Sequence, residues 1–119
     1  ALTHSREPVT LSALLDFVLN VLHAHSQGSR EGRQLLAARR LWFLPVVNPD
    51  GYEFNRRARP HGGGTKRKNC NHDGAACRAL ANAGVDLNRN FGFKFAHDNE
   101  GSSARACAED YRGSAAFSE

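Results

Sequence analysis

The stretch His4-Ser5-Arg6-Glu7-Pro8 lies directly before the clearest helical pattern of the chain. Its histidine and glutamate are three residues apart, and at the entrance to a helix this spacing lets both side chains converge on one cation. Zinc accepts imidazole nitrogen and carboxylate oxygen at about 2.0–2.2 Å. His4 and Glu7 are therefore candidate metal ligands. In isolation, such a pair is more often a surface His and Glu near a helix start, where Glu favours the helix dipole.

A helix is predicted over residues 8–25, immediately after this stretch. Pro8 suits the first turn, where its missing N–H costs nothing, and Gly28 is a plausible stop. The predicted apolar face consists of residues at helical spacing, namely Leu11, Leu14, Leu15, Val18, Leu22 and His25. Residues 31–39 have a weaker helical pattern, which favours a short turn-linked segment over a second helix.

The following part of the chain predicts strands, a turn and a long loop. Residues 41–47 form a continuous apolar run that is typical of a strand buried on both faces, although Pro45 removes one hydrogen-bond donor. Asn48-Pro49-Asp50-Gly51 predicts a turn, with Pro second and Gly fourth. Residues 56–83 are loop-like, and residues 85–88 predict another short strand. The pattern therefore favours an α/β fold.

Composition and length limit the possible classes. The chain has 119 residues, so it forms one domain at most, and its 40% hydrophobic and 24% charged residues are an ordinary globular mix. No stretch of about 18 apolar residues is evident, so no membrane-spanning segment is expected. Since the chain has no Met, we do not expect it to begin at a translation start. The absence of a visible signal peptide therefore says little about its compartment.

The formal net charge of +4 comes largely from one basic segment. We expect most of these side chains to be solvated, with Arg67 as the exception; the set is Arg56, Arg57, Arg59, Lys66, Arg67 and Lys68. A basic run can bind phosphate backbones. However, no aromatic residues interleave with this one and no nucleic-acid motif accompanies it, so a nucleic-acid partner is not expected.

Three motifs in a fixed order suggest a family. His4–Glu7, Asn48–Gly51 and Asp86-Leu87-Asn88-Arg89-Asn90 together closely resemble the zinc metallocarboxypeptidases of the carboxypeptidase A type. These enzymes remove single residues from the C-terminus of peptides. The resemblance implies a Zn²⁺ cofactor, a peptide or protein substrate with a free C-terminal carboxylate, and a monomer without a membrane partner. It also implies a mixed β-sheet flanked by helices.

The resemblance assigns roles to individual residues. His4 and Glu7 become zinc ligands, and Asp86 becomes the carboxylate that accepts the second N–H of His4 and fixes its tautomer. The alternative for Asp86 is a residue that caps a turn at a strand end. Asn88 and Arg89 are implied to bind the terminal carboxylate, which suits the planar fork of Arg. The alternative for Arg89 is a structural ion pair.

Two further arginines match less completely. Lys66-Arg67-Lys68-Asn69 is similar to the Trp-Arg-Lys-Asn segment of the family, in which the Arg stabilises the oxyanion formed at the scissile carbonyl. Lys66 stands where Trp is usual, so the register of this loop is open and a neighbouring Arg could take the role. Arg6 matches a subsite arginine for the substrate, with a structural role as the equal alternative.

The remaining catalytic residues of the family would lie downstream of this chain. By resemblance, these are a third ligand, which is a His, and a Glu that acts as general base. We therefore expect residues 1–119 to be part of a zinc carboxypeptidase catalytic domain, with the N-terminal strands and the C-terminal half missing, and to be inactive alone. The alternative is a non-catalytic, carboxypeptidase-like module that binds peptides or other partners.

The three cysteines are Cys70, Cys77 and Cys107. The resemblance implies a disulfide that ends at Cys107. Cys77 is the preferred partner because it is closer to Asp86, and Cys70 stays open. Such a bond implies an oxidising compartment, so we expect a secreted, extracellular or vacuolar protein. The rival is a small zinc site formed by Cys70, His72 and Cys77, but its spacing matches no common zinc finger.

Overall fold

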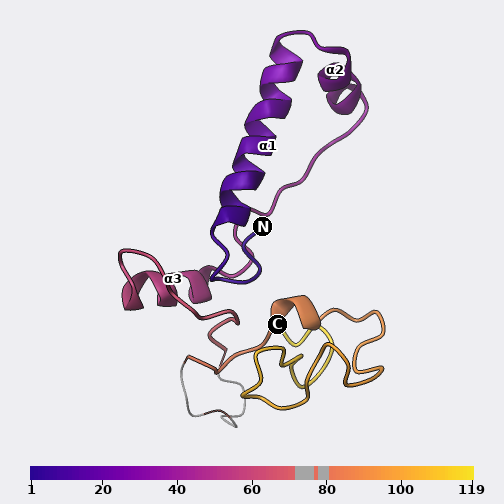
Figure 1. The fold of residues 1–119 in the computed structure, drawn as a ribbon. Helices are drawn as coiled ribbons and strands as arrows, with labels where there is room; N and C mark the ends of the chain where they lie inside the picture. The colour runs from indigo at the N-terminus through magenta and orange to yellow at the C-terminus, as the bar shows by residue number, and fades with distance from the viewer. Residues whose placement is uncertain (72–76, 78–80) are drawn as a thin grey trace.

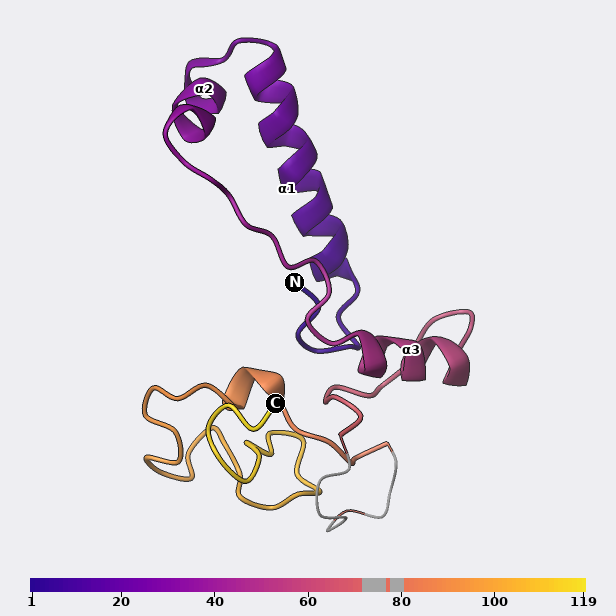
Figure 2. The same cartoon turned by 180° about the vertical axis from the view of Figure 1, so that it is seen from behind.

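The structure is a computed structural model that describes residues 1–71, 77 and 81–119. Its helical elements are α1 (Val9–Ser26), α2 (Arg30–Ala37), α3 (Pro49–Ala58) and the short 3₁₀ helix η1 (Leu87–Arg89). Figures 1 and 2 show α1 and α2 at one end and irregular chain around η1 at the other, with α3 near the junction. The radius of gyration is 17.7 Å, against about 13–14 Å for a compact chain of this length. The molecule is therefore elongated.

The first predicted helix is confirmed as α1, which packs against α2. Gly32 of α2 makes this contact possible, because a Cβ there would lie 2.6 Å from the backbone nitrogen of His25. Residues 30–37 form the helix α2, the less favoured of the two sequence interpretations, with the Ser29 side chain accepting a hydrogen bond from the Gly32 N–H at its start. The predicted apolar face of α1 is not buried: Leu15 is 48% exposed and Leu22 is 54% exposed.

The expectation that no segment is long and apolar enough to cross a membrane is wrong for α1 by length and composition. Its 18 residues have a mean hydropathy of 1.2. A core helix of a soluble protein and a signal sequence meet the same criterion, so this property is weak support for a membrane span.

The prediction of a mixed β-sheet flanked by helices is wrong. The described residues contain no strand, and their one isolated bridge joins Ser103 to Tyr111. Among the described residues, only Ala1 hydrogen-bonds to residues 41–47, through Leu44 and Val47, and Trp42 is 83% exposed. An apolar run becomes a sheet strand only when other strands pair with its edges, and a sequence pattern does not show whether they are there.

The turn predicted at residues 48–51 and the short strand predicted at residues 85–88 are both wrong, because polar side chains cap helices there. Asn48 is the N-cap of α3, its side-chain oxygen accepts a hydrogen bond from the Gly51 N–H at 3.0 Å, and Pro49 takes the first helical position. The expected turn is thus a helix start. Asp86 likewise accepts from the Asn88 N–H, which winds residues 87–89 into η1 rather than a strand.

The interior of the described region is mostly polar. The buried apolar residues are Leu2, Cys77, Ala83 and Val85, whereas the buried polar ones are Ser5, Asn48, Asn55, Lys66, Lys68, Asp86 and Asn90. Among the described residues, every buried side-chain nitrogen and oxygen has a hydrogen-bond partner. Directional hydrogen bonds therefore hold this region in place more than apolar packing does.

Gly51, which has no side chain, lets α3 pack closely against the loop of residues 4–7. A Cβ at Gly51 would lie 2.6 Å from the Ser5 hydroxyl and 2.7 Å from the carbonyl oxygen of Lys68. Gly51→Ala should therefore lower the free energy of unfolding by about 1–3 kcal/mol, measured by urea denaturation. Gln34→Ala on exposed α2 is the control and should stay within about 0.5 kcal/mol. Equal stability of both variants would contradict this packing.

Candidate metal and peptide-binding site

His4 and Glu7 converge as the sequence predicts. The Nδ1 atom of His4 lies 3.2 Å from Glu7 Oε1 and 3.1 Å from Glu7 Oε2. Two donors about 2.0 Å from one tetrahedral ion are separated by roughly 3.3 Å, so this spacing fits a shared Zn²⁺. The His4 side chain is 12% exposed and the Glu7 side chain 44% exposed, which leaves the pair accessible from solvent.

Asp86 lies at the centre of the site and is fully buried. Its Oδ1 atom is 3.2 Å from His4 Nε2 and accepts the Asn88 N–H at 3.0 Å. Its Oδ2 atom accepts from Arg67 Nε at 3.1 Å and Nη2 at 2.9 Å. The Asp86 backbone N–H donates to the carbonyl of Tyr111 at 2.8 Å. The carboxylate thus orients His4, and both the expected contact and the turn-capping alternative occur.

Both ring nitrogens of His4 face carboxylates, Nε2 that of Asp86 and Nδ1 that of Glu7. A metal ion bound at Nδ1 requires that nitrogen to be unprotonated, so the proton then lies on Nε2 and is donated to Asp86. This is the arrangement of a metal-binding histidine whose second nitrogen is fixed by a carboxylate. The residues present therefore fit a zinc ion held by His4 Nδ1 and Glu7.

The ligand set within the described residues is partial. No three His, Cys, Asp or Glu side chains among them converge to hold a metal ion. His4 and Glu7 supply two protein ligands, whereas a catalytic zinc site uses three. His72, part of the rival cysteine site, lies outside the described residues, but Cys77 is bonded to Cys107, which removes that site's second thiolate.

Arg67 lies between Asp86 and the metal-ligand candidate Glu7. Its guanidinium donates twice to Asp86, and its Nη1 atom lies 3.9 Å from Glu7 Oε1. Among the described residues, no hydrogen bond involves Nη1. Arg67 therefore presents a free donor beside Glu7, and no neighbouring arginine occupies this place.

The backbone around Arg67 is fixed by three buried side chains. Asn55 of α3 accepts the Lys66 N–H and donates to the Lys66 carbonyl, both at 2.9 Å. Ser5 donates its hydroxyl to the same carbonyl at 2.6 Å, and its N–H donates to the carbonyl of Arg67. Asn48 donates to the Arg67 carbonyl at 3.4 Å. Hydrogen bonds therefore join residues 4–7, called the metal loop below, to α3 and to the backbone of Arg67.

Asn88 and Arg89 both belong to η1. The Asn88 side chain is exposed and makes no hydrogen bond to the described residues, so its amide is open to a ligand. Arg89 donates from Nε to the carbonyl of Gly101 at 2.6 Å and from Nη1 to that of Asn88 at 3.0 Å. Neither contact is an ion pair, and Nη2 keeps its donors for an anion.

Arg6 has a partner that the sequence did not suggest. Its two terminal nitrogens donate to the two carboxylate oxygens of Glu109, each at 3.0 Å. The hydrogen bond from Arg6 lowers the pKa of Glu109 and raises that of Arg6. The structural alternative for Arg6 thus occurs, and this ion pair joins the metal loop to the segment after Cys107.

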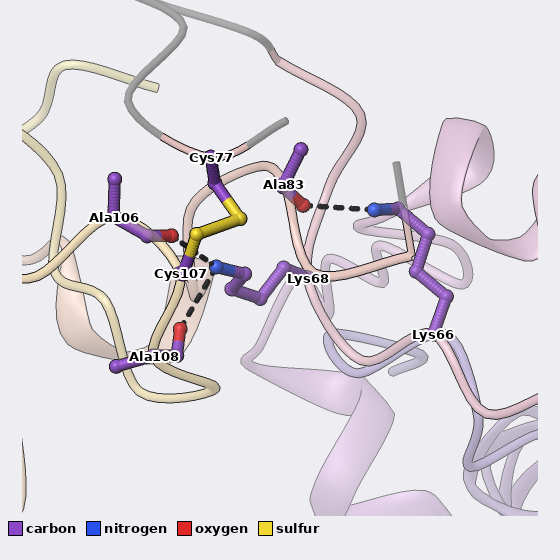
Figure 3. Close-up of a disulfide and its surroundings, with 7 residues drawn as sticks. All are labelled: Lys66, Lys68, Cys77, Ala83, Ala106, Cys107 and Ala108. Carbon is purple, nitrogen blue, oxygen red and sulfur yellow. Dashed lines mark hydrogen bonds between the residues drawn. A yellow bond between two sulfur atoms is a disulfide. The ribbon is translucent and has the colours of Figure 1, made fainter. Parts of the chain in front are cut away.

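The disulfide joins Cys77 to Cys107, as preferred from the sequence, with Cα atoms 5.0 Å apart (Figure 3). Cys70 is a free thiol. The bond closes a separation of 30 residues, and loops of this length gain about 3–4 kcal/mol in the chain-entropy view. A persistent disulfide is consistent with an oxidising compartment.

The solvated-loop prediction holds for part of the basic segment. Arg56, Arg57 and Arg59 are exposed, but Lys66 and Lys68 are only 2% and 3% exposed. Lys66 donates to the Ala83 carbonyl at 2.8 Å, and Lys68 donates to the carbonyls of residues 106 and 108, both at 2.8 Å (Figure 3). The prediction is wrong for these two lysines, because main-chain carbonyls replace water around their ammonium groups.

Lys68 should make stability depend on alkaline pH. Burial, with Lys66 nearby, lowers the pKa of Lys68 from 10.5 to about 8, against the opposing charges of Asp86, Glu109 and Asp110. Between pH 8 and 10.5 the unfolded chain binds more protons, so this group makes the free energy of unfolding rise with pH. The stability of wild type relative to Lys68→Met should therefore increase from pH 7.5 to 10 in urea titrations. A constant difference would contradict this.

Sequence reasoning missed the polar residues that hold the site together, namely Ser5, Asn48, Asn55, Lys66 and Lys68. A signal existed only for Asn48, because Asn before Pro-Asp-Gly is typical of a helix N-cap. The others are polar residues in segments with no periodicity, and their burial depends on contacts between distant parts of the chain.

Comparison with known proteins identifies the family of this chain. The family model described as zinc carboxypeptidase matches residues 1–119. The zinc carboxypeptidase of Simulium vittatum is 32% identical over 98% of this chain, and zinc carboxypeptidase A 1 of Drosophila melanogaster is 33% identical over 98%. Carboxypeptidase B of Helicoverpa zea is 40% identical over 65%. The chain spans 34%, 24% and 16% of these relatives, respectively. The chain therefore belongs to the zinc carboxypeptidase family.

Proposed function

We propose that this chain is part of a zinc-dependent exopeptidase that hydrolyses the C-terminal peptide bond of peptides or proteins. The observation that carries the proposal is the cluster around Asp86, in which His4, Glu7 and Arg67 meet within hydrogen-bonding or ion-pairing distance. A metal-ligand pair beside a partly buried, oriented guanidinium is the donor set that hydrolysis of a carbonyl requires.

His4 and Glu7 hold the zinc ion in this proposal. When bound, Zn²⁺ polarises the scissile carbonyl and lowers the pKa of water. Asp86 keeps the His4 ring in the tautomer that leaves Nδ1 unprotonated. The Nη1 group of Arg67 donates to the carbonyl oxygen as negative charge develops on it, which stabilises the transition state more than the ground state.

Asn88 and Arg89 bind the terminal carboxylate of the substrate. The amide of Asn88 is exposed, and Arg89 keeps donors that its two carbonyl contacts leave unused. Arg6 is the subsite arginine for the residues upstream of the scissile bond. To act there it exchanges Glu109, an exposed partner, for a substrate group.

Residues 1–119 form part of a longer catalytic domain. This proposal is supported by the short span of the relatives that the chain covers, and by the two ligands that its described residues bring together. The isolated chain should therefore release no amino acid from peptides. The protein that contains it should act as a monomer, outside membranes and without nucleic acid, in a secreted, extracellular or vacuolar setting.

Hydrolysis of a blocked dipeptide with a free C-terminus tests the proposal. The longer protein should release the terminal residue, a zinc chelator should abolish the release, and added Zn²⁺ should restore it. A blocked dipeptide amide is the matched control, because it lacks the carboxylate that Asn88 and Arg89 bind.

The second candidate is a non-catalytic module that binds peptide C-termini. The exposed Asn88 amide favours it, because binding requires only the carboxylate site. Saturable peptide binding by a folded, zinc-loaded protein that hydrolyses none of a varied set of terminal residues would support this module and contradict the enzyme.

A further inference from the structure

Three consecutive side chains, Lys66, Arg67 and Lys68, bind two other segments of the protein, residues 83–86 and residues 106–108. Lys66 donates to the carbonyl of Ala83, Arg67 to the carboxylate of Asp86, and Lys68 to the carbonyls on either side of Cys107. Figure 3 shows the two lysines reaching their carbonyls beside the disulfide. The residue that faces the metal pair is thus flanked by two anchored neighbours.

The segments that the lysines bind are the same ones that hold Asp86. Ala83 and Asp86 belong to one short stretch, so the Lys66 contact fixes the approach to the carboxylate. The segment of residues 106–111, which Lys68 binds, also supplies the Tyr111 carbonyl that accepts the Asp86 N–H. Both lysines therefore set the position of Arg67 and of its carboxylate partner together.

Aromatic rings and the disulfide stiffen these contacts. Lys66 Nζ lies 5.1 Å from the ring centroid of Phe54, and Lys68 Nζ lies 5.7 Å from that of Tyr111, both within the range of cation–π attraction. The Cys77–Cys107 bond tethers the carbonyls that Lys68 binds.

The free-energy cost of burying the Lys66 and Lys68 ammonium groups argues against a role in stability alone. An ammonium group loses its water on burial, and hydrogen bonds to carbonyls restore only part of that free energy. Burial accordingly lowers the pKa of both lysines. Buried charged groups that do not improve stability can instead specify one geometry, as happens in some proteins.

We propose that Lys66 and Lys68 are positioning residues that hold Arg67 in the orientation the peptidase reaction needs. The inference rests on the proposed function, because it concerns the same reaction. The part played by Lys66 is particular to this chain, since Lys66 stands where the resembling segment has Trp.

A double-mutant cycle on the longer protein tests the proposal. Lys66→Met and Lys68→Met are each made alone and together with Arg67→Ala, and kcat and KM are measured on the blocked dipeptide. Each lysine variant should lower kcat by about 10-fold or more, toward the 10²-fold loss that a displacement of about 1 Å can cause, with KM and zinc content unchanged. In the Arg67→Ala background the same lysine substitutions should change kcat by less than about 2-fold.

The control is Lys94→Met, an exposed lysine that should leave kcat unchanged in both backgrounds. Equal kcat losses with and without Arg67 would overturn the inference, because the lysines would then act independently of Arg67. Unchanged kcat in the folded single variants would overturn it as well. If a Met variant does not fold, Lys66→Gln or Lys68→Gln keeps a neutral donor and gives the same cycle. A wild-type protein without hydrolysis would instead contradict the proposed function.

Discussion

Replacing Arg67 with alanine should lower kcat for a blocked dipeptide by about 10²–10³-fold and leave KM within a few-fold. The reason is that Nη1 donates to charge that exists only in the transition state, and removal of one such donor has an effect of this size. Steady-state kinetics of folded, zinc-loaded protein measures both constants. Arg67→Lys should recover little of the loss, because an ammonium group cannot donate to Asp86 twice and to the substrate from the same plane.

Arg57→Ala is the matched control for this prediction. Arg57 lies on α3, is exposed and pairs only with Glu53 among the described residues. Its removal should leave kcat and KM unchanged. A raised KM with unchanged kcat in Arg67→Ala would show that Arg67 binds the ground state and does not stabilise the oxyanion.

Asp86→Ala should destabilise the protein by about 3–5 kcal/mol. Asp86 is fully buried and accepts from three groups, so its removal leaves the Arg67 guanidinium without its carboxylate and His4 without its orienting partner. Zinc affinity should also fall by about 10–100-fold, because the His4 tautomer is no longer fixed. Urea denaturation and competitive zinc titration measure the two effects.

Asp16→Ala on exposed α1 serves as the control for Asp86→Ala. Asp16 accepts one hydrogen bond from Asn20 in solvent, so its loss should change stability by at most about 0.5 kcal/mol. If Asp86→Ala kept wild-type stability and zinc affinity, the buried network would not be what holds the site together.

Contacts within the candidate site were easier to predict from the sequence than the β-sheet, for physical reasons. His4 and Glu7 are close in sequence, so their convergence needs only local geometry. Asp86 is 82 residues from His4, and its contact was expected only through the family resemblance. The helix α1 was predictable because its periodicity is local, whereas the burial of its apolar face depends on what packs against it.

The sheet was mispredicted for the same reason. The run of residues 41–47 has strand composition, but strands form only when edges pair, and among the described residues only Ala1 hydrogen-bonds to this run. Lys66 and Lys68 were wrongly predicted to be solvated because charged side chains in a loop usually lie in water. Lys66 and Lys68 are buried because carbonyls from distant segments surround them, and no local pattern encodes those partners.

Zinc retention tests the central claim, that His4 and Glu7 hold a catalytic metal, most directly. The longer protein, its His4→Ala and Glu7→Ala variants, and a His97→Ala control at an exposed histidine would be dialysed against a weak chelator, and zinc per protein would be measured by elemental analysis. The account predicts about one zinc per molecule in the wild type and the control, and loss of zinc in both site variants. Zinc retained by folded His4→Ala and Glu7→Ala proteins would contradict it.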